Sequence, residues 1–436
     1  MRKMRDSGAE WIGEVPEGWE IARLKSLFSY GKGLAITKAD LTPKGMPVIS
    51  YGQIHSKANS GTHLQDELLR CVSAEYLQTD GDCLLKKNDF VFADTSEDLE
   101  GLGNCAFVDR DDKIFAGYHT IVFHPKCDMP SKYLAYLFKT DCWRSQFRAK
   151  AYGIKVYSLS QRLLNDCSVV LPQEQEAERI ADYLDEKCAA IDGAIGELKR
   201  GMEDCKAWKK AIIEEAVLSG LRHKEFVETG DDWLTSIPSS WGFEQIRYLF
   251  ALRDERNDKP LSEVNLISLY TDQGVVQHCD LEKTTGNKAS TADGYKIVKE
   301  NDIVVNIILC WMGAIGRSAY NGVTSPAYDV YRPVDESRVL SRYYHYLFRT
   351  SRFNGKCYQE GRGIMMMRWR TYSSEFRAIK VPVPPIEEQQ AIADYLDEKC
   401  AAIDALVAEK EKLVADLEAY KKSLIFELVT GKREVA

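Results

Sequence analysis

Apolar residues recur at three- and four-residue spacing in two stretches of the chain, 172–221 and 385–436. This spacing puts them on one face of an α-helix. Acidic residues follow a proline at the start of each stretch, and Ser219-Gly220 and Thr430-Gly431 supply stop signals at the two ends. Each stretch therefore predicts one helix of roughly 45 residues, about 68 Å long.

A single helix of that length needs a second element to cover its apolar stripe. The two helices are each other's natural partners, and antiparallel pairing would carry the segments between them to opposite ends. We expect the positions of the first helix to be buried against those of the second. The positions are Ile195, Leu198, Met202 and Cys205 in the first helix, and Leu406, Leu413, Leu417 and Tyr420 in the second.

The remaining segments have the texture of strands and turns. Short runs rich in Val, Ile and aromatic residues, such as 47–54, 89–93, 120–125 and 302–311, are separated by Gly, Asn and Asp. One amphipathic helix is expected near the end of each segment, at about 131–148 and 341–357. The pattern predicts an α+β protein, with two mixed α/β domains joined by two long helices that form an antiparallel coiled coil.

An internal repeat relates the two halves of the chain. The sequence IADYLDEKCAAID occupies 180–192 and again 392–404, and W-(I/L)-x-x-x-P-x-x-W begins at Trp11 and at Trp233. Repeats on this scale indicate a duplicated structural unit. We expect domains 1–171 and 222–384 to share one fold, each followed by a repeated helix (172–221, 385–436) in a pseudo-two-fold arrangement. The equivalent positions are Asp89 with Asp302, Tyr118 with Tyr328, and Gly153 with Gly363.

Charge is sorted along the chain. The net charge is −8, with a pI near 5.6, but the windows 132–162 and 342–372 each hold seven basic residues and one acidic residue. Aromatic residues are interleaved with this charge. The two equivalent windows favour an electrostatic footprint on a phosphate backbone. Solvated helix faces are the alternative interpretation of the same charge.

No catalytic or metal-binding pattern stands out. A phosphate-binding loop G-x-x-x-x-G-K-(S/T), a nucleophile elbow and H-E-x-x-H are absent, and the seven histidines and twelve cysteines show no ligand spacing. The chain has no apolar run long enough to cross a membrane and no signal-peptide pattern. We expect a cytoplasmic, non-catalytic protein without a cofactor, a bound metal or a membrane partner.

At these motifs the chain resembles the specificity (S) subunits of type I restriction–modification enzymes over nearly its full length. The resemblance rests on the two W-(I/L)-x-x-x-P-x-x-W entries, the helix start Pro385-Ile-Glu-Glu-Gln389 through Asp397, and the Thr430-Gly431-Lys432 ending. The tracts 96–104 and 313–333 are also similar to target recognition domains of this family.

The resemblance implies two target recognition domains that each read half of a bipartite double-stranded DNA site. It also implies helices that dock two modification (M) subunits, and restriction (R) subunits that cleave DNA. S-adenosylmethionine, ATP and Mg are then expected on those partner subunits. A coiled-coil scaffold without sequence-specific DNA binding is the alternative.

The candidate DNA-contacting residues are polar, aromatic and basic positions expected on loops. In the first domain they are Lys32, Tyr51, Gln53, His55, Lys57, Lys155 and Tyr157, and in the second Tyr270, Gln273, Trp311, Arg317, Arg362, Arg368 and Arg370.

Overall fold

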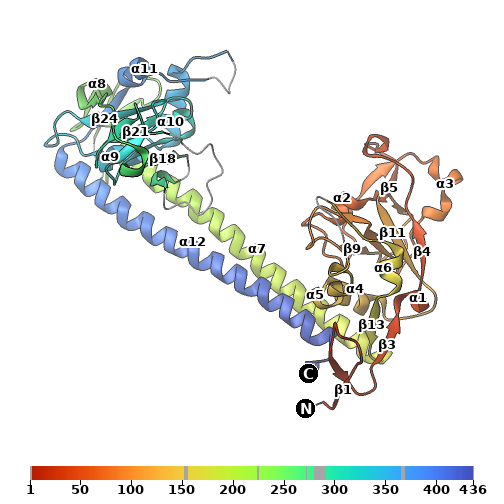
Figure 1. The fold of residues 1–436 in the computed structure, drawn as a ribbon. Coiled ribbons are helices and arrows are strands. Elements are labelled where there is room, and N and C mark those ends of the chain that lie inside the picture. Colours follow the sequence, from red (N-terminus) through yellow and green to blue (C-terminus); the bar gives the residue numbers. More distant parts are fainter. Residues whose placement is uncertain are drawn as a thin grey trace. The chain divides into compact units, whose positions relative to one another are not determined.

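The computed structural model describes residues 2–151, 156–222, 225–271, 273–278, 291–364 and 369–435. The chain forms two compact units, one made of Met1–Leu198 with Lys412–Ala436 and the other of Lys199–Glu411 (Figure 1). Two long helices, α7 (Glu174–Ser219) and α12 (Ile386–Val429), contribute residues to both units. No described helix combines the length and apolar character that crossing a membrane requires.

The first unit is built mainly from short strands with a few short helices. Its strands are β1 (Met4–Asp6), β2 (Glu14–Pro16), β3 (Glu20–Arg23), β4 (Phe28–Lys32), β5 (Met46–Ile49), β6 (Arg70–Val72), β7 (Phe90–Ala93), β8 (Thr95–Ser96), β9 (Cys105–Phe107), β10 (Phe115–Ala116), β11 (Thr120–Pro125), β12 (Tyr157–Ser158) and β13 (Ser168–Leu171). Its short helices are α1 (Leu24–Leu27), α2 (Tyr51–Ile54), α3 (Tyr76–Thr79), α4 (Ser131–Lys139), α5 (Asp141–Arg148) and α6 (Gln161–Asn165).

The second unit repeats this composition. Its strands are β14 (Phe226–Glu228), β15 (Ser236–Pro238), β16 (Gly242–Gln245), β17 (Phe250–Leu252), β18 (Ile267–Tyr270), β19 (Gly274–Gln277), β20 (Lys296–Val298), β21 (Ile303–Asn306), β22 (Ile315–Arg317), β23 (Gly322–Thr324), β24 (Tyr328–Pro333) and β25 (Lys380–Val383). Its short helices are α8 (Ile246–Leu249), α9 (Ser341–Leu347), α10 (Ser351–Glu360) and α11 (Ser373–Ala378).

The central sheets of the two units have the same strand order. The first is β4-β11-β7-β9 and the second β17-β24-β21-β22, both antiparallel. Asp89 and Asp302 hold the same place before the third strand, and each is preceded by an asparagine with positive φ, 73° and 69°. The predicted common fold is therefore confirmed, while Gly153 lies outside the described residues.

One predicted equivalence is wrong by two residues. β24 pairs Tyr328 with Asn306, whereas β11 pairs Thr120 with Ala93. Since Asp89 matches Asp302, Ala93 matches Asn306 and Tyr328 corresponds to Thr120 rather than to Tyr118. The segment from this aspartate to the strand is therefore five residues longer in the first domain than in the second, whereas the sequence equivalences put the difference at three.

The amphipathic segment expected near the end of each domain is two helices, not one. α4 and α5 are separated at Thr140, and α9 and α10 are separated before Ser351. Thr140 and Thr350 cap the second helix of each pair, because their side chains accept from the backbone N–H groups of Trp143 and Phe353. The cap lets the chain turn while the apolar face continues.

The repeated tryptophan motif joins each domain to the helices. The indole Nε1 of Trp19 donates to Glu176 at the start of α7, and that of Trp241 donates to Glu388 at the start of α12, both at 3.0 Å. Tyr133 donates to the carbonyl of Val429, and Tyr343 to that of Val217, both at 2.8 Å. Each domain therefore packs on the start of one long helix and the end of the other.

The long helices pair in antiparallel fashion within each unit. In the first unit Lys421 lies 2.6 Å from Asp192, and in the second Lys209 lies 2.6 Å from Asp404. Buried apolar residues of this pairing include Ile191, Ile195, Ile403, Val414 and Leu424. The predicted antiparallel coiled coil is confirmed.

The predicted burial of the second helix's stripe is partly wrong. Leu406, Leu413 and Tyr420 are 41%, 45% and 49% exposed. Two paired helices bury only a narrow seam of each other, and this row, spaced by seven residues, lies at its edge. On α7, Trp208 is also exposed. The apolar stripe is therefore wider than the helix pair can cover.

Candidate functional site

Four of the residues singled out in the first domain lie close to two adjoining cavities. The first cavity, of about 460 Å³, is lined by Tyr51, Gly52, His55, Ser96, Glu97, Asp98, Glu100, Gly101 and Asn104. The second, of about 310 Å³, is lined by Lys32, Gly33, Asp94, Gly117, His119, Thr120, Ile121, Leu159 and Gln161. The rings of Tyr51 and His119, 5.6 Å apart, link the two. Tyr157 reaches the same region because β12 pairs it with Ser96.

His55 is held in one orientation within the first cavity. Its Nε2 lies 2.8 Å from the carbonyl oxygen of Thr95, and its Nδ1 lies 3.2 Å from the amide nitrogen of Asn104. Arg144 in turn donates to the amide oxygen of Asn104 at 2.8 Å. Both ring nitrogens of His55 therefore have a polar partner. The ring is therefore a fixed element of the cavity wall.

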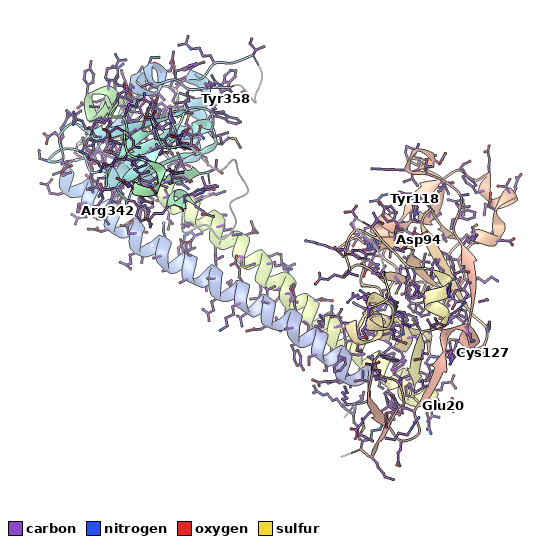
Figure 2. The ribbon with its side chains drawn as sticks, in the orientation of Figure 1. Glu20, Asp94, Tyr118, Cys127, Arg342 and Tyr358 are labelled. Atoms are coloured by element: carbon purple, nitrogen blue, oxygen red, sulfur yellow. The ribbon has the colours of Figure 1, made fainter. Side chains whose placement is uncertain are left out.

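His119 was not singled out from the sequence, although it lies at the junction of the cavities. Its φ of 55° is in the left-handed region, which costs a non-glycine residue about 1 kcal/mol or more. Its Nδ1 lies 3.3 Å from Asp94, and its ring contacts Tyr51 and Tyr118. Figure 2 shows Asp94 and Tyr118 close together in this region. No local sequence pattern marks such a conformation.

The first cavity favours hydrogen-bond donors over phosphates. Its wall includes the carboxylates of Glu97, Asp98 and Glu100. The backbone of this loop is fixed, because Arg144 and Arg148 both donate to the carbonyl oxygen of Glu100. Carboxylates accept hydrogen bonds from amino groups such as cytosine N4. The cavity therefore suits the edge of a nucleobase better than the phosphate backbone of a nucleic acid.

Two other candidates of the first domain have different surroundings. Gln53 caps α2, where its side-chain oxygen accepts from the backbone N–H of Ser50 at 3.2 Å, so that part of its amide is already engaged. Lys57 follows α2 and is exposed. Lys155 lies outside the described residues.

In the second domain the candidates fall into three places rather than one. Tyr270 and Gln273 are exposed at the β18–β19 turn. Arg317 donates to the side-chain oxygen of Asn301 at 2.7 Å. Trp311 contacts Tyr358 with ring centroids 5.5 Å apart.

Arg362 and Arg370 form the third place with Trp311, because Tyr358 stacks on Trp369 at 5.0 Å. The two arginines face each other through an isolated antiparallel bridge. Arg362 is ion-paired with Glu375, whereas Arg370 is exposed. Arg368 lies outside the described residues.

Most basic residues of the windows 132–162 and 342–372 make contacts within the protein. This corrects the interpretation of the whole windows as an electrostatic footprint on a phosphate backbone. The ion pairs are Lys132 with Asp185, Arg148 with Asp141, Arg342 with Asp394 and Asp397, Arg352 with Glu214, and Lys356 with Asp232. Burial lowers the pKa of Lys139 to about 8 and that of Arg144 to about 10. Lys150, Arg162 and Arg370 are exposed, and no ion pair within the described ranges involves them.

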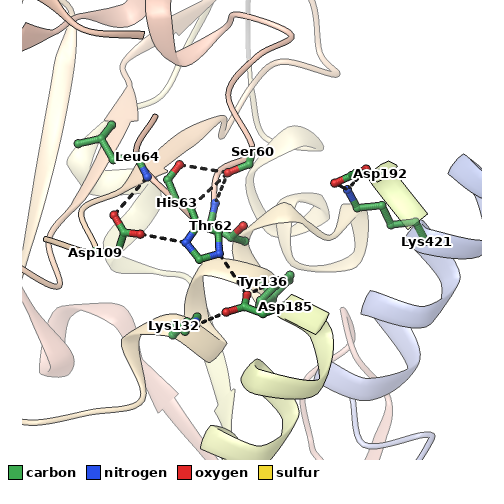
Figure 3. Close-up of polar contacts among 10 residues, drawn as sticks. All are labelled: Ser60, Thr62, His63, Leu64, Asp109, Lys132, Tyr136, Asp185, Asp192 and Lys421. Carbon is green, nitrogen blue, oxygen red and sulfur yellow. Dashed lines mark hydrogen bonds and ion pairs between the residues drawn. The ribbon is translucent and has the colours of Figure 1, made fainter. Parts of the chain in front are cut away.

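Part of this positive charge is paired with carboxylates of the two long helices. Figure 3 shows Asp185 of α7 bound by Lys132 and by the hydroxyl of Tyr136, which donates at 2.5 Å. His63 bridges Asp185 and Asp109 at 3.3 and 2.9 Å. Although burial opposes ionisation, Lys132 and Tyr136 hold the pKa of Asp185 below its usual value.

The second unit repeats this joint at the equivalent carboxylate. Asp397 of α12 accepts from Tyr346 at 2.5 Å and pairs with Arg342. Figure 2 shows Arg342 beside α12 and Tyr358 on a different side of the same domain. The joint to the helix and the third candidate place are therefore separate regions of this domain.

A metal site is not evident in the parts of the chain that the structure describes, where no group of three or more His, Cys, Asp or Glu side chains could hold an ion.

The family model and the relatives that match this chain are all described as type I specificity proteins. The family described as "Type I restriction modification DNA specificity domain" matches twice, at residues 16–195 and 240–414. The chain is 24% identical over 444 residues to a Methanocaldococcus jannaschii protein named as the specificity subunit of the MjaX type I restriction enzyme, covering 97% of this chain and 96% of that one. It is 23% identical over 315 residues to the EcoBI specificity subunit of Escherichia coli, covering 66% and 63%.

Solved structures share the fold at low identity. A chain from a type I R-M system, solved to describe complex assembly and conformational transition, matches with a TM-score of 0.67 and 15% identity over 96% of this chain and 99% of that chain. The HsdS subunit of Thermoanaerobacter tengcongensis matches with a TM-score of 0.53 and 15% identity, covering 96% and 98%. Both likenesses concern the arrangement of strands and helices.

Proposed function

This chain belongs to the family of type I restriction–modification DNA specificity proteins, and on that premise we propose a division of labour between its domains and its long helices. It is the DNA sequence-recognition subunit of such a system, and the catalytic steps belong to other subunits. Residues 1–171 and 222–384 act as two target recognition domains, each reading one half of a bipartite double-stranded DNA site. Residues 172–221 and 385–436 act as the repeated helices between them.

The common strand order of the two domains is the observation that carries this proposal. Two copies of one fold, each joined to the helices by the same tryptophan and tyrosine contacts, match a DNA site made of two separated halves. A scaffold protein would have no need for two such domains, nor for the two cavities of the first domain. The acidic helices would repel phosphates and so keep DNA on the domains.

The proposed DNA contacts come from both domains. In the first domain they are the residues around the two cavities with Lys57, and in the second Tyr270, Gln273, Trp311, Arg317, Arg362 and Arg370. Lys155 and Arg368 are proposed from sequence. Gln53 and His55 have internal partners, so their proposed role is to shape the surface that meets the bases.

The helices are proposed to dock the modification subunits. Leu413 and Tyr420 in the first unit, and Trp208 and Leu406 in the second, leave apolar surface uncovered on the helix pair. Burying such a row is the normal driving force for adding a further helix. Two M subunits, with R subunits added for cleavage, complete the complex. S-adenosylmethionine, ATP and Mg belong to those partners, and a DNA-bound complex of this kind would work in the cytoplasm.

The test is selection of bound sites from a randomised duplex pool by the chain assembled with its partner subunits. The unaltered complex should select two fixed half-sites separated by a fixed spacer. Arg370→Ala should alter the second half-site only, and Lys57→Ala the first only, so that each variant is the control for the other. A base contact would relax one position and cost about 1–3 kcal/mol, whereas a phosphate contact would lower the salt slope by about one.

A second arm tests the helices. Inserting four residues into each helix adds about 6 Å and should change the spacer while both half-site sequences stay the same. No enrichment of any sequence would leave the scaffold interpretation in its place. Changed half-site bases after helix insertion would overturn the division of labour.

A further inference from the structure

Three described residues other than glycine have a positive φ, and two of them are equivalent positions of the shared fold. Asn88 and Asn301, at 73° and 69°, each precede the aspartate before the third strand of a central sheet. Because both copies of the fold repeat this conformation, the conformation belongs to the fold. The third residue is His119, at 55°, and the second domain does not repeat its conformation.

The short connection that holds His119 occurs in both domains. Residues 117–119 join β10 to β11, and residues 325–327 join β23 to β24. Since Thr120 corresponds to Tyr328, Ala327 takes the place of His119, and Ala327 is not among the residues with a positive φ. The second domain therefore makes a connection of the same length with an ordinary backbone. A strained conformation that the shared fold does not require points to a role in binding rather than in folding.

The ring of His119 is fixed in direction where the two cavities meet. Its carbonyl oxygen accepts from the backbone N–H of Asp94 at 3.2 Å, and the carbonyl of Tyr118 accepts from that of Tyr51 at 3.3 Å. The imidazole packs edge-on against the rings of Tyr51 and Tyr118, with centroids 5.6 and 6.0 Å apart. The His119 side chain nevertheless stays 57% exposed. A ring that is held this firmly and remains open to solvent is suited to contact a binding partner.

The neighbours of His119 indicate which partner it contacts. His119 shares the second cavity with Lys32, which lies opposite Ile121 on the adjacent strand. An ammonium group only donates hydrogen bonds, whereas an imidazole can donate from one ring nitrogen and accept at the other. In the major groove a purine presents N7, an acceptor, beside a group at C6 that is an amino donor in adenine and a carbonyl acceptor in guanine. Lys32 and His119 together therefore match the edge of a purine.

The same cavity disfavours a phosphate group. Asp94 lines it and lies 3.3 Å from Nδ1 of His119. A phosphate brought to the imidazole would also meet this carboxylate, and like charges repel. The edge of a purine carries no net charge and avoids the repulsion. The carboxylates of the adjoining first cavity act in the same direction.

We propose that Lys32 and His119 read one purine of the first half-site through its major-groove edge. This inference rests on the proposed function, since it concerns how the first domain reads its half-site. Lys32 donates to N7, which both purines carry, and so selects a purine over a pyrimidine. His119 contacts the group at C6 and so selects one purine over the other.

The experiment repeats the selection from a randomised duplex pool with the assembled complex carrying His119→Gly. One position of one half-site should change from a single purine to either purine, and the originally selected duplex should bind about tenfold more weakly. The urea unfolding midpoint of the first unit, followed by hydrogen exchange of the β7 amides, should not fall, because glycine adopts a positive φ without strain.

Lys32→Met tests the other member of the pair and keeps the length of the side chain. The same position should then lose its preference for purines over pyrimidines. A 7-deazapurine at this position lacks the N7 acceptor and should weaken binding to the unaltered complex about tenfold. The same analogue should make almost no difference to the Lys32→Met complex.

Asn88→Gly is the matched control, because it relieves the same backbone conformation in the same domain at a residue that lines neither cavity. It should leave the selected sequence unchanged. An unchanged selection with His119→Gly would overturn the proposal. A lower unfolding midpoint with that variant would make His119 a structural residue and would also overturn it.

The remaining outcomes separate this inference from the proposed function. If both variants weaken binding to all sequences alike and make the salt dependence shallower, Lys32 and His119 contact phosphates. The purine contact then fails while the proposed function stands. If the unaltered complex selects no sequence at all, the proposed function itself fails.

Discussion

The two units place the same buried carboxylate in the same position and satisfy it in different ways. Asp89 and Asp302 each accept from the backbone N–H three residues earlier at 2.7 Å. Asp89 lies 2.9 Å from Nδ1 of His124. Asp302 instead pairs with Arg253, which is only 7% exposed. Arg253 directly follows β17, whereas His124 belongs to β11. The duplication has therefore preserved the turn that the carboxylate closes, while its charged partner has changed.

A second pair of equivalent positions also carries different side chains in the two units. Arg349 follows α9 and donates to the carbonyl oxygens of Ile315 at 3.0 Å and Thr271 at 3.2 Å. Lys139 ends α4 at the equivalent place, and burial together with the nearby Lys421 lowers its pKa to about 8. The guanidinium gains several acceptors from one position, which an ammonium group does not reproduce. The cation at this position therefore stabilises the second unit, whereas the equivalent cation is unfavourable in the first.

The largest difference is expected when the shared carboxylate is removed. Asp302→Asn leaves a buried guanidinium without its main partner and should lower the unfolding free energy of the second unit by about 2–4 kcal/mol, because Glu255 at 2.6 Å retains part of the pairing. Asp89→Asn should cost the first unit about 1 kcal/mol, because the amide oxygen can still accept from the backbone N–H of Lys86 and no guanidinium is left without its partner. Hydrogen exchange of the β21 and β7 amides during urea unfolding measures the two units separately. Equal losses would mean that the partners are energetically equivalent.

The next comparison predicts effects of opposite sign. Arg349→Met should lower the stability of the second unit by about 1–3 kcal/mol, since backbone carbonyls lose a charged donor. Lys139→Met should raise the stability of the first unit at pH 7 by about 1–2 kcal/mol, because a cation with a lowered pKa is unfavourable where it lies. Thermal unfolding followed by peptide-resolved hydrogen exchange distinguishes the two variants. Destabilisation by Lys139→Met would contradict the assignment.

The pH dependence of Lys139 follows from the same shift. Between pH 8 and pH 10.5 the folded chain releases the Lys139 proton while the unfolded chain keeps it. The unfolded state then binds more protons, so this residue makes the stability of the first unit rise with pH across that window. The rise should be smaller in Lys139→Met than in the unaltered chain. Urea titrations at pH 7.5 and 10 provide the measurement.

The smallest effects are expected where the two units are the same. The ion pairs Asp192–Lys421 and Asp404–Lys209 have one distance, 2.6 Å, and both carboxylates are largely exposed. Asp192→Ala and Asp404→Ala should each cost about 0.2–1 kcal/mol, decreasing with added salt. Urea unfolding at 0.05 and 0.5 M NaCl tests both. A large loss at only one pair would show that the symmetry of the helix pair is superficial.

The architecture could be predicted from the sequence, because the repeat and the helical spacing are visible in the order of the residues alone. The identical stretches at 180–192 and 392–404 predicted both helices, and the tryptophan motif marked both domain entries. The break at Thr140 escaped prediction, because a capping threonine inside an apolar pattern does not interrupt that pattern. The exposed row at Leu413 escaped for a related reason, since spacing reports the width of a stripe and not the width of the surface that covers it.

The candidate site was harder to predict because positive charge has two uses. Lys132 and Arg342 belong to basic windows, yet both bind carboxylates of the long helices. Counting charges along the chain could not separate a cation that holds a helix from one that faces DNA. The strained His119 had no sequence signal at all, because its position depends on a turn between strands that meet only in the folded domain.

The way α12 ends has a consequence for the order in which the protein can be made. Leu424, Leu428 and Val429 belong to the core of the first unit, and Gly431 packs on Pro16 and Trp19. The second unit consists of the continuous stretch from Lys199 to Glu411. During synthesis the second unit therefore has all its residues first. The domain that leaves the ribosome earliest must wait, with part of its core uncovered, until the last turn of α12 has been made.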